Sequence, residues 1–302
     1  MQAAVIGIGS NSVRVLVARN HDGVFERICR DREGTRLFAG LDSRRMLKEE
    51  SILKTAEAVR RMTAAVLRTG TENLSIFATS AARDAANGPE LLKAIEEASG
   101  ISPTILSGEE EARLSFFGAS RAVKDECYCG VTDIGGGSTE IVTGCGDDIE
   151  CAFSCQMGAV RLFREIPIQR TEDMASVVDA AREILEKKLA ENGEFRRPEI
   201  WIGTGGTFTT LAAMVKEIPW TARTHMHGTR VTKEEIRGVG EKLAGMPLEE
   251  RIRLPGLQPG RADIVVHGIC ILLAVMDRFE IEKITVSEWG NLDGYLWKKL
   301  MQ

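Results

Sequence analysis

The fold of this chain is decided by Val131-Thr132-Asp133-Ile134-Gly135-Gly136-Gly137-Ser138-Thr139-Glu140-Ile141-Val142, which aligns without a gap with Val5-Ile6-Gly7-Ile8-Gly9-Ser10-Asn11-Ser12-Val13-Arg14-Val15-Leu16. In both copies a β-rich run enters a turn of Gly, Ser or Asn and leaves as a second β-rich run, which predicts a hairpin. Glycines let the backbone approach a ligand closely, and successive N–H groups with hydroxyls form a concave anion site suited to phosphate. Asp133 stands at the strand end of the second copy, where the first copy has Gly7. The sequence therefore predicts a duplicated phosphate loop that lacks one carboxylate.

Length and composition indicate a globular protein of two domains. A chain of 302 residues is long enough for two hydrophobic cores, and its 43% hydrophobic and 27% charged residues are ordinary for such proteins. There is no apolar run of eighteen residues and no signal peptide, so we expect a cytoplasmic protein without a membrane partner. The net charge of -5 argues against nucleic acid as a partner, because nucleic-acid binding depends on Lys and Arg.

Cysteine and histidine spacings favour structural roles over metal binding. Seven cysteines without a secretory signal indicate reduced thiols, and the pairs Cys127/Cys129 and Cys151/Cys155 lack the usual zinc spacing. His225-x-His227 has strand spacing, which would place both rings on one face, but no carboxylate lies nearby in the sequence.

The predicted elements follow the same order in each half, which predicts a duplicated α/β fold. The first half has predicted strands at 3–8, 13–18, 24–29, 74–78 and 103–106, with helices at 49–68, 89–98 and 109–121. The second half has predicted strands at 128–134, 139–143, 149–153, 199–202 and 283–286, with helices at 159–165, 171–190, 207–215, 233–243, 262–276 and 292–300. We expect domains at 1–122 and 123–302, with the last helix packing back on the first domain. Packing the halves together would place both glycine turns across one cleft, the expected ligand site.

The chain order resembles the two-domain architecture of sugar kinases, actin and heat-shock chaperone ATPases. The detailed resemblance is to the exopolyphosphatase and guanosine pentaphosphate phosphohydrolase (Ppx/GppA) phosphatase family. Its motifs occur in family order: Ile8 to Arg14, Thr79 to Ala85, Ser107 to Leu114, Asp133 to Glu140, Gly203 to Thr207, Pro255 to Leu257 and Arg261 to Asp263. The resemblance implies duplicated ribonuclease H-like (actin-like ATPase) domains with a cleft between them.

The same resemblance implies a site for phosphoryl transfer to water. Glu111 matches the family's general base, which orients and deprotonates the attacking water. Asp133 would hold Mg2+, or Mn2+ in its place, and Glu140 would order the metal's water shell. Arg83 matches a basic family position and is read as a phosphate contact. The residues expected to hold phosphates are Ser10, Asn11, Ser12, Gly135, Gly136, Gly137, Ser138 and Thr139.

Several of these residues have an alternative reading. Glu140 can be an exposed acid at a strand end, and Arg83 a solvated arginine at a helix start. Arg14 faces opposite its apolar neighbours and lines the cleft or faces solvent. For Glu109 and Glu110 we favour a helix start, because Ser107 and Glu110 have the spacing of a capping box.

The chain departs from the family pattern in two places. Family members have Asp where this chain has Gly7, so metal binding and activity should be weakened, and restoring Asp there should tighten the Mg2+ dependence. The segment Gly290-Asn291-Leu292-Asp293-Gly294 replaces a Gly-Leu-Arg-Glu-Gly-like family segment, with loss of one basic residue. The helical C-terminal domains of the long exopolyphosphatases are missing, which favours shorter substrates.

Hydrolysis of a terminal phosphoanhydride, in inorganic polyphosphate or guanosine pentaphosphate, is the leading functional hypothesis. The alternative is a polyphosphate or guanosine tetra- and pentaphosphate sensor with weakened catalysis, motivated by Gly7. A sugar or acetate kinase fits less well, because the Glu111 segment matches a water-activating role. A homodimer would suit a cleft enzyme of this size.

Overall fold

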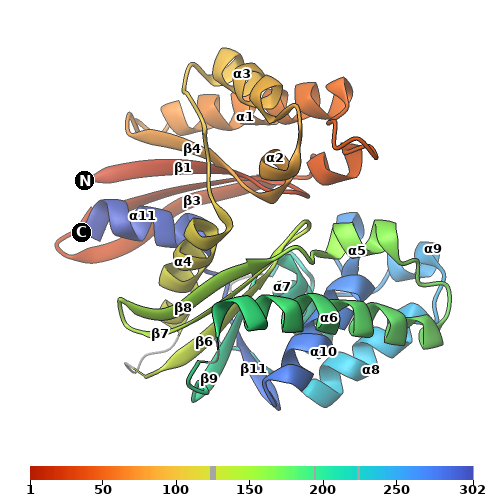
Figure 1. Cartoon of the computed structure of the whole chain (residues 1–302). Helices are drawn as coiled ribbons and strands as arrows, with labels where there is room; N and C mark the ends of the chain where they lie inside the picture. Colours follow the sequence, from red (N-terminus) through yellow and green to blue (C-terminus); the bar gives the residue numbers. More distant parts are fainter. Residues whose placement is uncertain (123–126, 194, 223–224, 302) are drawn as a thin grey trace.

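Two α/β lobes make up the computed structural model, which describes residues 1–122, 127–193, 195–222 and 225–301 (Figure 1). The first sheet has the strand order β3-β2-β1-β4-β5, and the second has the order β10-β11-β9-β6-β7-β8. In each lobe the first three strands run antiparallel, and the next strand joins parallel to the first one. The predicted duplication of an α/β domain is therefore confirmed.

The strands lie close to their predicted positions. Those of the first lobe are β1 (Gln2–Ile8), β2 (Val13–His21), β3 (Val24–Glu33), β4 (Leu74–Ala78) and β5 (Thr104–Ile105). Those of the second lobe are β6 (Cys129–Ile134), β7 (Thr139–Cys145), β8 (Asp148–Cys155), β9 (Ile200–Thr204), β10 (Arg230–Thr232) and β11 (Lys283–Val286).

Helices cover both faces of each sheet. They are α1 (Glu49–Leu67), α2 (Ser80–Asp84), α3 (Gly88–Ser99), α4 (Gly108–Ala119), α5 (Ala159–Glu165), α6 (Met174–Asn192), α7 (Gly206–Val215), α8 (Lys233–Ala244), α9 (Leu248–Arg251), α10 (Val265–Arg278) and α11 (Asn291–Met301). Strand β1 is buried on both sides: Ala4 and Ile6 face the core that contains α1, whereas Ala3 and Val5 face α11.

The lobes exchange one helix each. α4 precedes the second lobe in the chain but packs on its sheet, with Phe116 and Phe117 against Val131 and Val142. α11 ends the second half of the chain but packs on the first sheet through Leu292, Leu296 and Leu300. The domain boundary expected at residue 122 stays a prediction; α4, which precedes it, packs mainly on the second sheet, while Leu114 also contacts the core under the first sheet. That boundary adjoins residues 123–126, which lie outside the described residues.

The exchanged helices pack with their backbones in contact. A Cβ atom on Gly294 of α11 would lie 1.9 Å from the carbonyl oxygen of Leu114, and one on Gly118 would lie 2.0 Å from that of Gly290. Only glycine fits at either position, so this contact fixes the distance between α4 and α11.

Short elements account for what the sequence analysis missed. α2, α9 and β10 have only five, four and three residues, too few to show a hydrophobic period. The strand spacing of His225 and His227 does not place them in a strand, because both lie in the turn region before β10. Among the described residues, none of the helices is both long and apolar enough to cross a membrane.

We expect Gly294→Ala to lower the free energy of unfolding by about 1 to 3 kcal/mol, because the new methyl group overlaps the Leu114 carbonyl. Gly238→Ala is the matched control, since its Cβ meets no atom within 4 Å on the exposed face of α8. The control should gain up to about 1 kcal/mol from helix propensity. Urea unfolding of the two variants measures both effects, and equal stability of the two would contradict the close helix contact.

Candidate active site

The two hairpin turns have the same backbone closure. The Gly9 N–H donates to the Ser12 carbonyl at 3.0 Å, and the Gly135 N–H donates to the Ser138 carbonyl at 2.9 Å. The turns also touch across the lobes, because a Cβ on Gly136 would lie 2.9 Å from the Ser10 Cβ. A larger residue at position 136 would therefore collide with Ser10 of the first turn.

The carbonyl groups of both turns point toward the scaffold. Those of Ser10 and Asn11 accept hydrogen bonds from the backbone N–H groups of Phe38 and Arg36. Those of Gly135, Gly136 and Gly137 accept from the start of α5 and from the Arg161 side chain. In a trans peptide the C=O and the following N–H point in opposite directions. The N–H groups of residues 11–12 and 136–138 are therefore directed into the space between the lobes, as an anion cradle requires.

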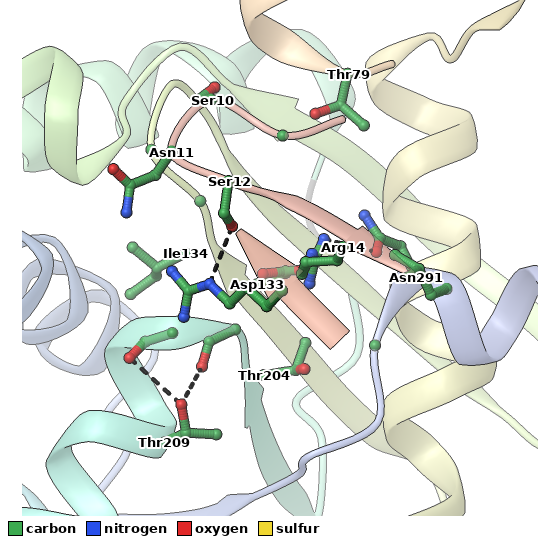
Figure 2. Close-up of a pocket in the computed structure, with 18 of the residues that line it drawn as sticks. Ser10, Asn11, Ser12, Arg14, Thr79, Asp133, Ile134, Thr204, Thr209 and Asn291 are labelled. Carbon is green, nitrogen blue, oxygen red and sulfur yellow. Dashed lines mark hydrogen bonds between the residues drawn. The ribbon is translucent and has the colours of Figure 1, made fainter. Parts of the chain in front are cut away.

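A cleft of about 170 Å3 lies where the turns meet. Figure 2 shows Ser10, Asn11 and Ser12 of the first turn around the same opening as Asp133 and Thr204 of the second lobe. The predicted site residues that line it are Ser10, Asn11, Ser12, Glu111, Asp133, Gly135, Gly136, Gly137 and Ser138. Arg83, Thr139 and Glu140 are not among the described residues that line it.

Glu111 is a buried carboxylate that reaches the cleft from the first turn of α4. The capping box predicted for this helix start is confirmed, with Ser107 Oγ accepting from the Glu110 N–H at 3.1 Å. Burial raises the pKa of Glu111 to about 7; Arg83 opposes this shift, and the charge of Asp133 adds to it. A carboxyl group with a pKa near neutrality is suited to general base catalysis.

Arg83 lies against the Glu111 carboxylate and is not among the described residues that line the cleft. Its Nη1 donates to the Leu106 carbonyl at 2.7 Å and to Glu111 Oε2 at 3.3 Å. The phosphate contact expected of Arg83 stays a prediction, because the structure shows its guanidinium engaged with Glu111.

Asp133, the residue before the end of strand β6, lines the cleft. Its Oδ2 accepts a hydrogen bond from the buried Ser115 hydroxyl at 2.7 Å. The sequence analysis missed Ser115, although it lies four residues after Glu111 and hence on the same face of α4. α4 therefore supplies both the Glu111 carboxylate and the hydroxyl that contacts Asp133.

Glu140 and Thr139 are buried in β7 beside the cleft. Glu140 is 1% exposed, so the exposed-acid reading is wrong; it accepts from the Ser154 hydroxyl at 2.7 Å. Burial and the charges of Glu111 and Asp133 raise the pKa of Glu140 well above its ordinary value. The Thr139 hydroxyl donates to the Met157 carbonyl. Neither side chain contacts the cleft, so their predicted roles toward metal and phosphate stay predictions.

The donor set suits a cation that keeps several of its own waters. In the described parts of the chain, no three His, Cys, Asp or Glu side chains converge to hold a metal unaided. Asp133 still offers a carboxylate at the cleft, with Glu111 nearby. Mg2+ is commonly held by one or two carboxylates, several waters and substrate phosphates. The residues present therefore fit Mg2+, which Asp133 would hold together with waters and substrate phosphates.

Arginines, threonines and the segment around the start of α11 complete the lining of the cleft. Arg14, left open above, lines the cleft and donates to Asn291 Oδ1 at 3.0 Å (Figure 2). Lining residues outside the predicted site include Arg14, Arg27, Arg30, Arg32, Thr79, Ser80, Thr204, Thr209, Gln258, Arg261, Glu288 and Asn291. Some of these residues belong to motifs found in the sequence, namely Thr79 to Ala85, Gly203 to Thr207 and Arg261 to Asp263. The sequence analysis missed the arginines of β3, because that strand carries no motif.

Gly7 lies in an apolar environment. It pairs with Arg14 on β2, as Asp133 pairs with Glu140 on β7. A Cβ at Gly7 would lie 2.8 Å from Leu292 Cδ1 and 3.2 Å from the Phe77 ring. The two departures from the family pattern, at residues 7 and 290–294, are thus in direct contact.

Comparisons with known proteins agree on one family. The chain matches the model of the Ppx/GppA phosphatase family over residues 16–302. It is 30% identical over 313 residues to exopolyphosphatase 2 of Mycobacterium tuberculosis, with 97% of each chain covered. The crystal structure of an exopolyphosphatase-like protein superposes with a TM-score of 0.91 at 27% identity, covering 99% of this chain and 98% of the other. A Ppx/GppA enzyme of Aquifex aeolicus gives a TM-score of 0.83 at 28% identity, with 99% of each chain covered.

The surroundings of Gly7 change what Gly7→Asp should do. We expect this variant to lose about 1 to 3 kcal/mol of unfolding free energy and to gain no stabilisation by Mg2+, because Leu292 and Phe77 occupy the place of the carboxylate. Adding Leu292→Ala should recover a Mg2+-dependent rise in melting temperature. Gly7→Ala carries the same Cβ without the charge and is the control. A Mg2+-dependent rise in Gly7→Asp alone would show that Leu292 moves aside freely.

Proposed function

The chain belongs to the Ppx/GppA phosphatase family, and on this basis we propose that it hydrolyses the terminal phosphoanhydride bond of inorganic polyphosphate. The observation that carries the proposal is the convergence of both glycine turns, Glu111 and Asp133 on one cleft. Relatives named exopolyphosphatase that match nearly the whole chain support a hydrolase with this substrate.

The proposed reaction is a direct attack of water on the terminal phosphorus. Glu111 accepts a proton from the attacking water while the oxygen of that water bonds to the terminal phosphorus. The bridging P–O bond breaks at the same time, and its electron pair leaves with the bridging oxygen on the shortened phosphate chain. The N–H groups of residues 11–12 and 136–138 hold the terminal phosphates and stabilise their charge in the transition state. Mg2+ bound at Asp133 would neutralise phosphate charge during the transfer. Arg83 holds the Glu111 carboxylate in place.

Guanosine pentaphosphate is a further proposed substrate, because its 5′ end presents the same terminal phosphoanhydride to the turns. A sensor that binds without turnover is the competing proposal; the apolar contact of Gly7 with Leu292 favours it, since it leaves Asp133 as the main metal ligand. Cytoplasmic location, a homodimer and the absence of a nucleic-acid partner stay predictions from the sequence.

The decisive experiment is phosphate release from polyphosphate and guanosine pentaphosphate, side by side, across Mg2+ and Mn2+ titrations. We expect metal-dependent turnover that Glu111→Gln lowers about 10^2- to 10^4-fold, the usual contribution of a general base. Glu109→Gln on the same helix is the matched control, because Glu109 is exposed and pairs with Arg113.

The sensor and the enzyme give opposite results in this experiment. Tight, metal-insensitive binding of either compound without phosphate release would replace hydrolysis by the sensor function. An equal loss of turnover in Glu109→Gln and Glu111→Gln would argue against Glu111 as the base.

Activity should also depend on pH through Glu111. Because the base must be deprotonated and its pKa is raised to about 7, kcat/KM should fall about tenfold per pH unit below that value. Arg83 opposes the rise, so Arg83→Gln should raise the pKa further and shift the acid limb to higher pH. A pH profile of kcat/KM measures the shift; a raised KM with an unmoved limb would instead support the phosphate contact predicted for Arg83.

A further inference from the structure

A β-bulge in β3 gathers three arginines on one face of the first sheet. Arg32, Arg30 and Arg27 pair with Arg14, Leu16 and Ala18 of β2, whose alternate residues share a face. Between Arg30 and Arg27 the register shifts, and Ile28 has no partner on β2. Without this extra residue, Ile28 would occupy the place that Arg27 takes. Bulges commonly re-aim side chains next to functional sites.

This row of arginines begins at the phosphate turn. Arg32 Nε donates to the Ser12 hydroxyl at 3.1 Å, and Figure 2 shows this bond as a dashed line beside the cleft. Arg30 and Arg27 follow along the strand, and all three line the cleft. At about 3.3 Å per residue the row extends roughly 15 Å from the turn.

Glu288, between β11 and α11, and Asp293, in the first turn of α11, supply carboxylates to the row. Arg30 Nη2 lies 2.9 Å from Glu288 Oε2, and Arg27 Nε lies 2.9 Å from Asp293 Oδ1. Both acidic side chains are only 5% exposed, whereas that of Arg30 is 31% exposed. Asp31 also lines the cleft, but it pairs with Val15 and so alternates with Arg30 and Arg32 along the strand. An incoming anion would therefore compete with Glu288 for Arg30.

We propose that Arg32, Arg30 and Arg27 bind the phosphates of a linear phosphate chain that lie beyond the one being cleaved, and that the chain displaces Glu288 from Arg30. The proposal rests on the proposed function and names the part of the substrate that this wall of the cleft recognises. Guanidinium groups form bidentate hydrogen bonds with phosphate oxygens, and a row of them matches a ligand charged along its length.

We call Arg32, Arg30 and Arg27 together the arginine track. The proposal predicts opposite effects for substitutions at Arg30 and at Glu288, the two partners of one ion pair. Arg30→Gln should raise KM and Kd for long inorganic polyphosphate about tenfold more than for tripolyphosphate, because only the long chain reaches Arg30. Glu288→Gln should lower both constants for the long chain, because the chain no longer displaces a carboxylate. Arg19→Gln, which removes an exposed ion pair with Glu26 on the same hairpin, is the matched control and should change neither substrate.

Steady-state kinetics and calorimetric binding with both substrates test the binding of the phosphate chain by the three arginines. In Arg30→Gln alone, Glu288 is left buried without its ion-pair partner. The double variant Arg30→Gln/Glu288→Gln removes that carboxylate charge and so isolates the loss of the arginine. We expect the double variant to keep the selective loss for the long chain. Two results would overturn the proposal: an equal loss of affinity for both substrates in the double variant, or weaker binding of the long chain in Glu288→Gln. Either result would mean that the Arg30–Glu288 pair has only a structural role.

Failure of the proposed function is separable from failure of the track. No phosphate release by the wild-type protein would remove the hydrolase, while the binding measurements still decide the track. Normal turnover with equal effects on the two substrates would remove the track alone.

Discussion

The backbone contact between α4 and α11 constrains the rest of the structure. Gly118 and Gly294 let the two helices approach until each would collide with any larger residue. α4 carries Glu111 and Ser115 on the second sheet, and α11 begins with Asn291, the partner of Arg14 on the first. Because each lobe is covered by a helix from the other half of the chain, the spacing of these two helices also sets the spacing of Glu111 and Arg14 across the cleft.

The duplicated hairpins have diverged through what covers them. At the end of β6, Asp133 meets the hydroxyl of Ser115 from α4, which stabilises a carboxylate. At the corresponding end of β1, Gly7 meets Leu292 from α11, which offers no hydrogen bond. The end of β6 is polar because α4 covers it with a hydroxyl, and the end of β1 is apolar because α11 covers it with a leucine. This asymmetry leaves a single acid at the strand ends, although the turns keep the same closure.

Much of the fold and part of the site can be predicted from local patterns. Both hairpins, the alternating order of elements and the capping box at Ser107 are each written in contiguous residues. The convergence of Asp133 and Glu111 was expected only from the resemblance of their motifs to those of the family. The partner of Arg83, the apolar contact of Gly7 and the bulge at Ile28 could not be predicted, because they depend on residues distant in the sequence or on strand register. Ser115 was within reach, since its spacing from Glu111 places it on the same helix face.

The helix exchange also has a consequence for synthesis of the chain. The face of the first sheet formed by Val5, Leu16 and Phe77 is buried by Leu292 and Leu296, which the ribosome adds almost three hundred residues after β1 begins. Domains generally fold in the order in which they emerge, but this lobe cannot complete its core in that order. Its apolar face stays uncovered until the second lobe has been made. The first lobe thus needs the last helix to complete its core as well as to set the geometry of the cleft.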